Sequence, residues 1–269
     1  PNVNNVTVSG GTLTNITTLT TNYVSVSNVG TMTNITSIVA NTATGANFAT
    51  GAVLTNVSYV NVTAAGNGVT LLGSLAAQSS TLNANIIGTS NVTRLGNNTW
   101  TLNSNTSNYT GTTTVGNGTL VANQLFALGN TANISFINAG GGGTLQFNAN
   151  VSLLTTDLSV MGNLGTIAVT AGNTVVIGNT TGALVTGNAT ALLTKSGGGN
   201  LLLANGLTNF AAGVTVSAGI LDLNGQAPNV NNVTVSGGTL TNITTLTTNY
   251  VSVSNVGTMT NITSIVANT

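Results

Sequence analysis

The stretch "NVTVSGGTLTNITTL", residues Asn5–Leu19, decides the fold class of this chain. Aliphatic residues alternate with Thr, Ser and Asn along it, first at Val6 and Val8 and again after the glycine pair. Alternation with a period of two places one set of side chains on each face of an extended strand, and β-branched residues favour such strands. The stretch therefore predicts β-strands with an aliphatic inner face and an outer face of hydroxyls and amides.

The same pattern returns at short intervals, which indicates a solenoid. "TNIT" begins at Thr14 and again at Thr33, and the related "TNVS" begins at Thr55. A unit of about 19 residues is too short for a pair of helices and suits one coil of a β-helix. Strong helix formers are scarce, and Gly and Asn recur at turn spacing. We therefore expect an all-β fold, a right-handed parallel β-helix (β-solenoid) with about 19 residues per coil and no helices of note.

A much longer repeat sets the expected domain organisation. Residues 1–42 and 228–269 are identical, so the sequence returns to its own beginning at position 228. We expect 1–227 to form one full solenoid period of about 12 coils, and 228–269 to start the next identical period. Such periodicity is typical of a structure that grows along one axis.

The composition argues against several classes of partner. The chain has two basic and two acidic side chains, with no His or Cys, whereas Thr and Asn number 52 and 43. Without clustered Lys and Arg, neither nucleic acid nor an anionic membrane surface is an expected partner. No stretch is apolar enough for membrane insertion as a helix, and the sequence opens without the features of a signal peptide, as a mature or excised segment would. Stability should also be nearly indifferent to salt and pH, because almost no charge exists to screen or titrate.

Catalytic and metal-binding groups are equally scarce. Asp157 and Asp222 are separated by roughly three to four coils, too far for the paired carboxylates of a glycoside hydrolase. The glycine run Gly140–Gly143 has no neighbouring Asp that could bind calcium. We therefore expect no enzyme activity, no cofactor and no metal site.

A third level of repetition has an offset of 101 residues and aligns Thr93–Asn123 with Thr194–Asn224. We interpret its paired residues as structural positions of the coil. These pairs are Arg94 with Lys195, Trp100 with Leu201, Tyr109 with Phe210, and Gly118 with Gly219.

The later of these segments, "LTKSGGGNLLLANGLTNFAAGVTVSAGILDLNG" at Leu193–Gly225, resembles the autotransporter-associated β-strand repeat of bacterial surface passenger domains. The earlier segment matches the family pattern through its aromatic corner and its "TTV" and "GTL" strands. The later one departs at the corner, where Ala211 and Ala212 replace threonine and glycine. The two segments cover about a quarter of the chain. The resemblance implies an extracellular protein of the bacterial cell surface, a secreted stalk or adhesin.

These patterns predict a structural segment of an extracellular filament or surface fibre, whose partner is its own kind through axial stacking or continuous tandem repeats. Two alternatives stay open: an adhesin stalk that binds glycans or other cells, and an ice-binding solenoid that uses outward Thr ladders. Four aromatic residues could form a sugar-binding strip, although aromatic residues more commonly fill solenoid corners. They are Tyr23, Tyr59, Trp100 and Tyr109.

The outward polar face also carries sequons for N-glycosylation. In "NIT" the central aliphatic residue points inwards, which leaves Asn and Thr facing solvent. The candidate sites are Asn15, Asn34, Asn56, Asn91 and Asn188.

Overall fold

The computed structural model describes residues 1–27, 29–41, 45–49, 52–62, 68–73, 79–137, 141–162, 164–178, 185–188, 190–205, 207–208, 210 and 212–268. Within these ranges the regular secondary structure consists of β-strands. The chain divides into two compact units, Pro1–Ala132 and Asn133–Thr269, and each is described by itself.

The first unit contains β1 (Asn2–Ser9), β2 (Thr12–Ser27), β3 (Thr31–Ala40), β4 (Ala46–Phe48), β5 (Val53–Val62), β6 (Gly68–Gly73), β7 (Ser79–Leu82), β8 (Asn85–Ile87), β9 (Asn91–Gly96), β10 (Thr99–Leu102), β11 (Thr112–Val115) and β12 (Gly118–Ala122).

The second unit contains β13 (Asn133–Phe136), β14 (Gly143–Phe147), β15 (Val151–Leu153), β16 (Asp157–Val160), β17 (Leu164–Val169), β18 (Thr174–Ile177), β19 (Val185–Gly187), β20 (Leu192–Ser196), β21 (Asn200–Leu203), β22 (Leu207–Thr208), β23 (Gly213–Val216), β24 (Gly219–Gln226), β25 (Asn232–Ser236), β26 (Gly238–Thr248), β27 (Tyr250–Ser254) and β28 (Thr258–Ala267).

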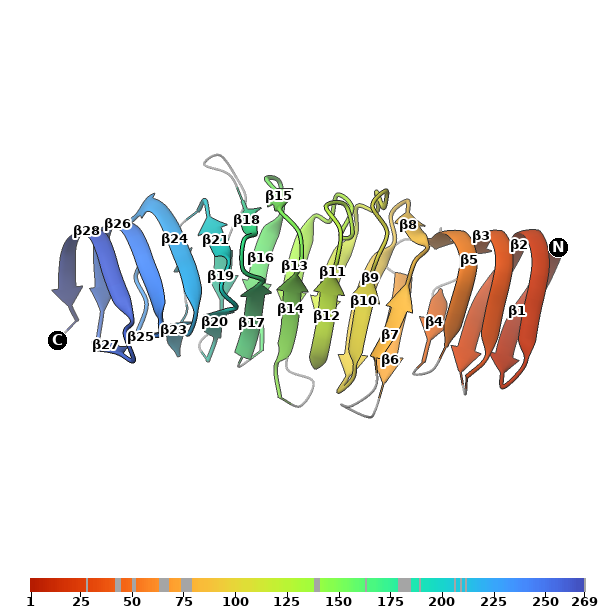
Figure 1. Cartoon of the computed structure of the whole chain (residues 1–269), viewed down its shortest axis with the longest axis horizontal. Helices are drawn as coiled ribbons and strands as arrows, with labels where there is room; N and C mark the ends of the chain where they lie inside the picture. Colours follow the sequence, from red (N-terminus) through yellow and green to blue (C-terminus); the bar gives the residue numbers. More distant parts are fainter. Residues whose placement is uncertain are drawn as a thin grey trace. The chain divides into compact units, whose positions relative to one another are not determined.

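Parallel strands of the first unit stack coil upon coil (Figure 1). One sheet has the order β11-β9-β6-β4-β2-β3-β5-β8, with β1 also paired to β2, and another has the order β12-β10-β7. The long strand β2 turns a corner, because its first part pairs with β3 whereas Val24–Val26 pairs with β4. One strand therefore contributes to two faces of the same coil.

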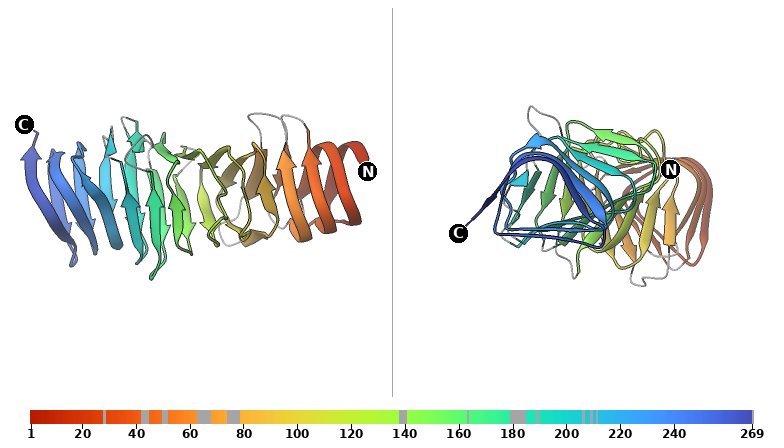
Figure 2. Two further views of the ribbon diagram at one scale, coloured as in Figure 1. Left: turned by 90° about the horizontal axis from the view of Figure 1, so that it is seen from above. Right: turned by 60° about the vertical axis from the view of Figure 1, so that its left-hand side comes forward.

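The second unit has the same parallel construction on three sheets. Their orders are β22-β19-β16-β13, β27-β25-β23-β20-β17-β14 and β15-β18-β21-β24-β26-β28. Figure 2 shows the coils of this unit running round three sides. The ladders from β23 to β25 and from β24 to β26 continue across the sequence-repeat boundary at 227/228.

The predicted all-β parallel β-helix is confirmed, but the predicted coil length is wrong for most of the chain. The spacing is about 21 residues per turn, and the chain contains about 11 turns. Thr12 pairs with Thr31 in the next coil, whereas Leu164 reaches its partner Leu192 only after a considerably longer coil. The expected value came from the repeated terminal segments, while the step from coil to coil is longer in the middle of the chain, as between Leu158 and its partner Val185.

Aliphatic columns form the core of each unit. Leu19, Ile38 and Val60 are paired in successive coils of the first unit, and each is at most 1% exposed. Burial of one such side chain stabilises the fold by about 1.5–3 kcal/mol. Because each coil covers the aliphatic side chains of its neighbour, the core grows with every coil added.

The two copies of the 42-residue segment fold in the same way in their different units. Strand β1 pairs with β2 in the register in which β25 pairs with β27, and β2 pairs with β3 in the register in which β26 pairs with β28. Burial differs between the copies. Ile38 is fully buried beneath β5, whereas the equivalent Ile265 is 53% exposed in β28, at the edge of its sheet.

Candidate functional site

Asparagines in the left-handed backbone conformation form corners of the coils. Asn15 and Asn34 have φ of 59° and 53° in the first unit, and Asn242 and Asn261 have φ of 59° and 51° in the second. Among residues with a side chain, Asn tolerates this conformation best. Asn34 Nδ2 donates to Asn15 Oδ1, and Asn261 Nδ2 to Asn242 Oδ1, both at 3.2 Å. The corners therefore carry ladders of side-chain amides from coil to coil.

In the second unit this ladder ends on a carboxylate. Asn242 Nδ2 donates to Asp222 Oδ2 at 2.7 Å, and the backbone N–H of Asn224 donates to Asp222 Oδ1 at 2.8 Å. Both carboxylate oxygens thus accept hydrogen bonds, and bonds to an ionised acceptor are stronger than neutral ones. Asp222 consequently anchors the corner that precedes the repeated segment.

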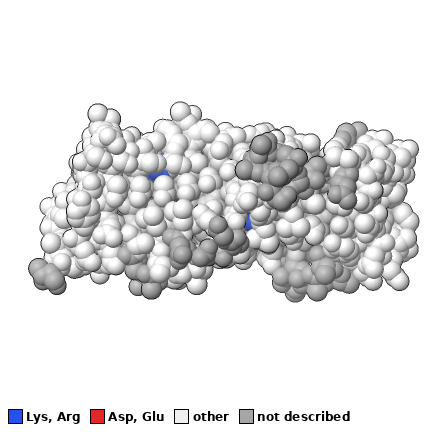
Figure 3. All heavy atoms as spheres, turned by 90° about the horizontal axis from the view of Figure 1, so that it is seen from below, with Lys and Arg blue, Asp and Glu red and all other residues white. Residues whose placement is uncertain are grey.

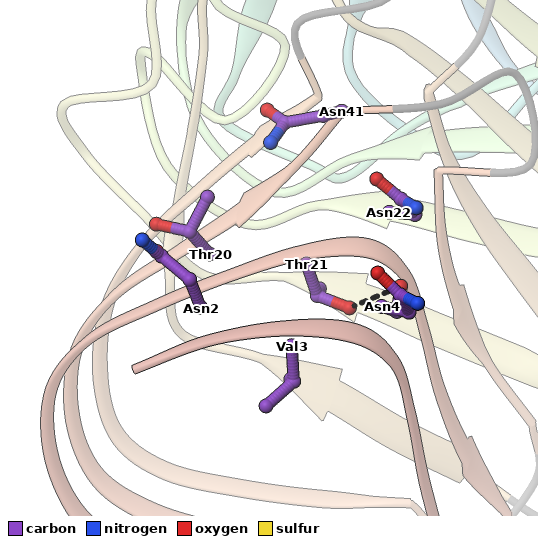
Figure 4. A pocket seen from close by; sticks show the side chains of 7 residues that line it. All are labelled: Asn2, Val3, Asn4, Thr20, Thr21, Asn22 and Asn41. Carbon is purple, nitrogen blue, oxygen red and sulfur yellow. Dashed lines mark hydrogen bonds between the residues drawn. The ribbon is translucent and has the colours of Figure 1, made fainter.

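A polar groove of about 600 Å³ lies beside the first coil (Figure 4). Its lining residues are Asn2, Val3, Asn4, Thr20, Thr21, Asn22 and Asn41. Their amides and hydroxyls can exchange hydrogen bonds with the hydroxyl groups of a sugar. None of these seven side chains titrates, so the groove presents neutral hydrogen-bonding groups.

Beside this groove, a buried threonine closes the corner between the two faces of the coil. Thr21 is 1% exposed, and its Oγ1 donates to the carbonyl oxygens of Asn4, at 3.1 Å, and Tyr23, at 3.0 Å. In the second unit Thr248 Oγ1 makes the equivalent bonds to Asn231 O and Tyr250 O, at 3.0 and 3.1 Å. Alternation and repeat spacing do not predict this corner, although "TTNY" in both copies is a signal that could have revealed it.

The two basic side chains lie inside the coils, where backbone carbonyls surround them. Lys195 is fully buried, and its Nζ donates to Ser196 O and Gly197 O, both at 2.7 Å, and to Ala218 O at 3.1 Å. Burial lowers the pKa of Lys195 to about 8. The ammonium group therefore serves as a hydrogen-bond donor between two coils, with carbonyl oxygens as its partners.

Arg94 occupies the matching place in the first unit. It is fully buried, and Nη1 donates to Leu71 O at 3.3 Å and to Leu95 O. Nη2 donates to Gly96 O at 3.1 Å, to Asn98 Oδ1 at 2.6 Å and to Asn98 O. Burial lowers the pKa of Arg94 to about 10.

The other paired positions of the 101-residue repeat also occupy matching places. Trp100 pairs with Leu120 in the first unit, as Leu201 pairs with Leu221 in the second, and all four are fully buried. The equivalent glycines beside the two cations both have positive φ. They are Gly118 at 62°, whose added Cβ would lie 2.5 Å from Arg94 Nη2, and Gly219 at 65°, where it would lie 2.8 Å from Lys195 Nζ.

Of the four residues predicted for a sugar-binding strip, the three whose side chains the structure describes are buried or half-buried. Trp100 and Tyr109 are fully buried, Phe210 is 1% exposed, and Tyr23 is half-buried. Trp100 Nε1 donates to Leu72 O at 3.0 Å. Trp100, Tyr109 and Phe210 therefore fill the interior of the coils. The Tyr59 side chain lies outside the described residues.

The two acidic residues lie on different sheets of the second unit. Asp157 begins β16, and Asp222 lies in β24, so neither strand is a ladder neighbour of the other. Among the described residues there is no group of three or more metal-ligating side chains.

The face in Figure 3 shows basic atoms as small isolated spots among uncharged residues.

The five predicted glycosylation sites fall in different settings. Asn15 and Asn34 are exposed, although their amides bond to each other. Asn91 Oδ1 accepts from the Thr112 N–H at 2.8 Å, and Asn188 Nδ2 donates to Met161 O at 2.7 Å, so both amides hold the backbone of a neighbouring segment. The side chain of Asn56 lies outside the described residues.

Threonine hydroxyls of neighbouring coils bond to each other, as ladders require. In the second unit Thr239 and Thr258 share a hydrogen bond of 2.7 Å, and Thr260 Oγ1 donates to Thr241 Oγ1 at 3.0 Å. These hydroxyls therefore take part in hydrogen bonds between neighbouring coils. Coil lengths vary along the described part of the chain, from the step between Asn2 and Thr20 to the longer step between Leu164 and Leu192.

Comparison with known proteins does not place the chain in a family. No family model, curated protein or solved structure matches it. The described part of the chain has no helix with the length and apolar character required to cross a membrane.

Proposed function

We propose that this chain is a structural segment of an extracellular bacterial filament or surface fibre, in which identical solenoid periods follow one another. One observation carries the proposal: residues 1–42 and 228–269 take the same strand register although they pack against different neighbouring coils. A segment that folds alike in two settings can be repeated without altering its fold. Repetition along one axis is what a fibre requires.

The cohesion of such a fibre would come from backbone ladders and aliphatic columns. Each coil bonds to the coils before and after it, and side chains such as Ile38 are buried by the next coil. Neutral amide ladders, including Asn34 to Asn15, add hydrogen bonds along the same direction. None of these interactions depends on an ion pair, so cohesion would persist at high salt.

The extracellular and bacterial part of the proposal rests on sequence resemblance. Leu193–Gly225 resembles the autotransporter-associated β-strand repeat, which implies export to the cell surface. The buried, matched positions of the 101-residue repeat, such as Trp100 and Leu201, are consistent with a coil motif used twice.

Addition of one further 227-residue period to the chain tests the structural role. A period has on the order of ten coils at a rise of about 4.8 Å each, so electron microscopy should show particles longer by on the order of 50 Å at unchanged width. Fibre diffraction should show a meridional reflection near about 4.8 Å. A second separate particle, or a wider one, would exclude the proposal.

A glycan-binding stalk is a second candidate, favoured by the groove beside the first coil. The groove is large enough for a short saccharide and is lined mostly by amides and hydroxyls. A glycan array probed with the whole chain tests this, with Asn2→Ala and Asn41→Ala as variants that remove amides from the lining. Signal that survives both substitutions would place any glycan elsewhere. Thermal hysteresis measurements on the same material test the ice-binding alternative.

A further inference from the structure

The coil corner at Asn224 and Gly225 presents a reactive sequence in an open setting. The chain contains four Asn-Gly pairs, at Asn67, Asn117, Asn205 and Asn224. In this dipeptide the backbone nitrogen of glycine can attack the Asn side-chain amide, because glycine has no Cβ to obstruct the five-membered ring. Among the four pairs, both residues are described at Asn117–Gly118 and Asn224–Gly225.

The backbone at Asn224 is released from the regular ladder. Asp222 pairs with Thr241, and the next pair of β24 with β26 is Gln226 with Ile243, so residues 223–225 form a bulge. Asn224 and Gly225 have φ of 52° and 73°, and both are exposed. Bulges disrupt the ladder locally and leave the extra residue unpaired.

Space around this pair permits the ring to close. A Cβ added at Gly225 would meet nothing within 4 Å, and Asn224 and Gly225 line a groove of about 360 Å³ that opens to solvent. The described contacts of Asn224 and Gly225 engage backbone atoms: the Asn224 N–H donates to Asp222 Oδ1, and Thr244 Oγ1 donates to Gly225 O. Water can therefore reach both the attacking nitrogen and the amide carbon.

The pair Asn117–Gly118 offers a matched contrast in the first unit. Asn117 is half-buried, and its Oδ1 is buried. A Cβ at Gly118 would lie 2.5 Å from both Arg94 Nη2 and Asn98 O, and the adjacent Thr119 N–H donates to Asn98 O at 3.1 Å. Neighbouring groups therefore enclose the glycine and the side-chain oxygen of this pair, in contrast to the open setting of Asn224 and Gly225.

We propose that Asn224 is a site of spontaneous, selective deamidation. The Gly225 nitrogen bonds to Asn224 Cγ and loses its proton to water, water returns a proton to Nδ2, the Cγ–Nδ2 bond breaks, and ammonia leaves. Water then opens the succinimide at either carbonyl, which yields aspartate or isoaspartate. No electron transfer and no enzyme are required.

The reaction would alter the electrostatics of a chain whose formal net charge is zero. Each event adds one carboxylate close in sequence to Asp222, at the end of the amide ladder. Isoaspartate would in addition insert a methylene into the backbone of the bulge. Both products weaken the corner, because like charges at short range disfavour each other. A fibre built from such periods would acquire negative charge with age.

Incubation of the whole folded chain in mild alkaline buffer tests the proposal. Chymotryptic peptides are then analysed by mass spectrometry for replacement of NH by O, with isoaspartate identified by fragmentation. We expect Asn224 to react faster than Asn117 by on the order of tenfold or more, since small displacements from an attack geometry slow ring closure strongly. In the urea-unfolded chain the two sites should react at similar rates.

Two matched variants assign the signal. Asn224→Gln should abolish the mass gain in its peptide, because Gln cyclises through a larger and slower ring, whereas Asn117→Gln should leave that gain unchanged. The proposal is overturned if Asn117 keeps pace with Asn224 in the folded chain. It is equally overturned if Asn224 is unreactive there, or if its peptide still gains mass in Asn224→Gln.

Discussion

The hydroxyl of Tyr109 lies 2.7 Å from Oγ1 of Thr113, and both residues are fully buried in the first unit. Thr113 Oγ1 donates on to Thr131 Oγ1 at 3.0 Å, and Thr131 Oγ1 donates to Gly111 O at 2.8 Å. At the two equivalent positions of the 101-residue repeat stand Phe210 and Val214. A buried polar pair in one unit thus corresponds to an apolar pair in the other.

A double-mutant cycle on this pair should show strong coupling. Tyr109→Phe removes one buried hydrogen bond and should lower the free energy of unfolding by about 1 kcal/mol. Thr113→Val leaves the tyrosine hydroxyl buried without this partner and should cost about 2 kcal/mol. The double variant, which reproduces Phe210 and Val214, should cost less than the sum, as measured by urea unfolding. Simple additivity would show that the two hydroxyls are not energetically linked.

Alanine at Gly219 should be far more damaging than alanine at Gly225. Both glycines have positive φ, so each substitution should cost about 1–2 kcal/mol in backbone strain. At Gly219 the new Cβ would also lie 2.2 Å from Gly199 O and 2.8 Å from Lys195 Nζ, whereas at Gly225 it meets open space. We expect a loss of about 3 kcal/mol or more for Gly219→Ala, because overpacking adds to the strain. Equal losses in thermal or urea unfolding would argue against a tight cage around Lys195.

The general indifference to pH predicted from composition should fail between pH 8 and 10, where Lys195 titrates. Burial holds the pKa of Lys195 at about 8 in the folded chain, below the ordinary value of 10.5. Above pH 8 the unfolded chain then binds more protons than the folded chain, so the free energy of unfolding should rise between pH 8 and 10. Below pH 8 both states carry the charge, and this gain is absent.

Lys195→Met is the control for that pH dependence, because it removes the titrating group and should flatten the rise in urea midpoint. Measurements should stop near pH 10. Burial raises the pKa of Tyr109, and above that pH ionisation of the unfolded chain's tyrosine begins to oppose the trend. A midpoint that falls from pH 8 to 10 in the natural chain would contradict the buried lysine.

The identical segments allow one substitution to be tested in two environments. Ile38→Ala creates a cavity beneath β5 and should cost about 2–5 kcal/mol. Ile265→Ala changes the same residue in the same local sequence, but this side chain is 53% exposed. The free energy of unfolding should therefore fall by less than about 1 kcal/mol. Similar losses at both positions would mean that Ile265 is covered in solution, which analytical ultracentrifugation of the chain would then detect as self-association.

The candidate site was only partly predictable. The outward ladders of Asn and Thr followed from alternation, and the equivalence of Arg94 and Lys195 followed from the 101-residue repeat. The carbonyls that surround Lys195 come from the next residues and from Ala218 in another coil, so sequence spacing alone did not identify them. The role of Asp222 as the end of an amide ladder likewise depends on a bulge that alters the register of β24.

By itself, the sequence determined the class of fold and the direction of its growth. Period-two alternation and the short, regular return of "TNIT" are local properties, and they are enough to predict parallel coils with an aliphatic interior. Only the tertiary structure decided the coil lengths in the middle of the chain and the hydrogen-bond partners of the buried cations. It also decided which strands of each 42-residue copy are buried by a neighbouring coil. Those features arise between coils about 20 residues apart, where the length of each connection sets which side chains meet.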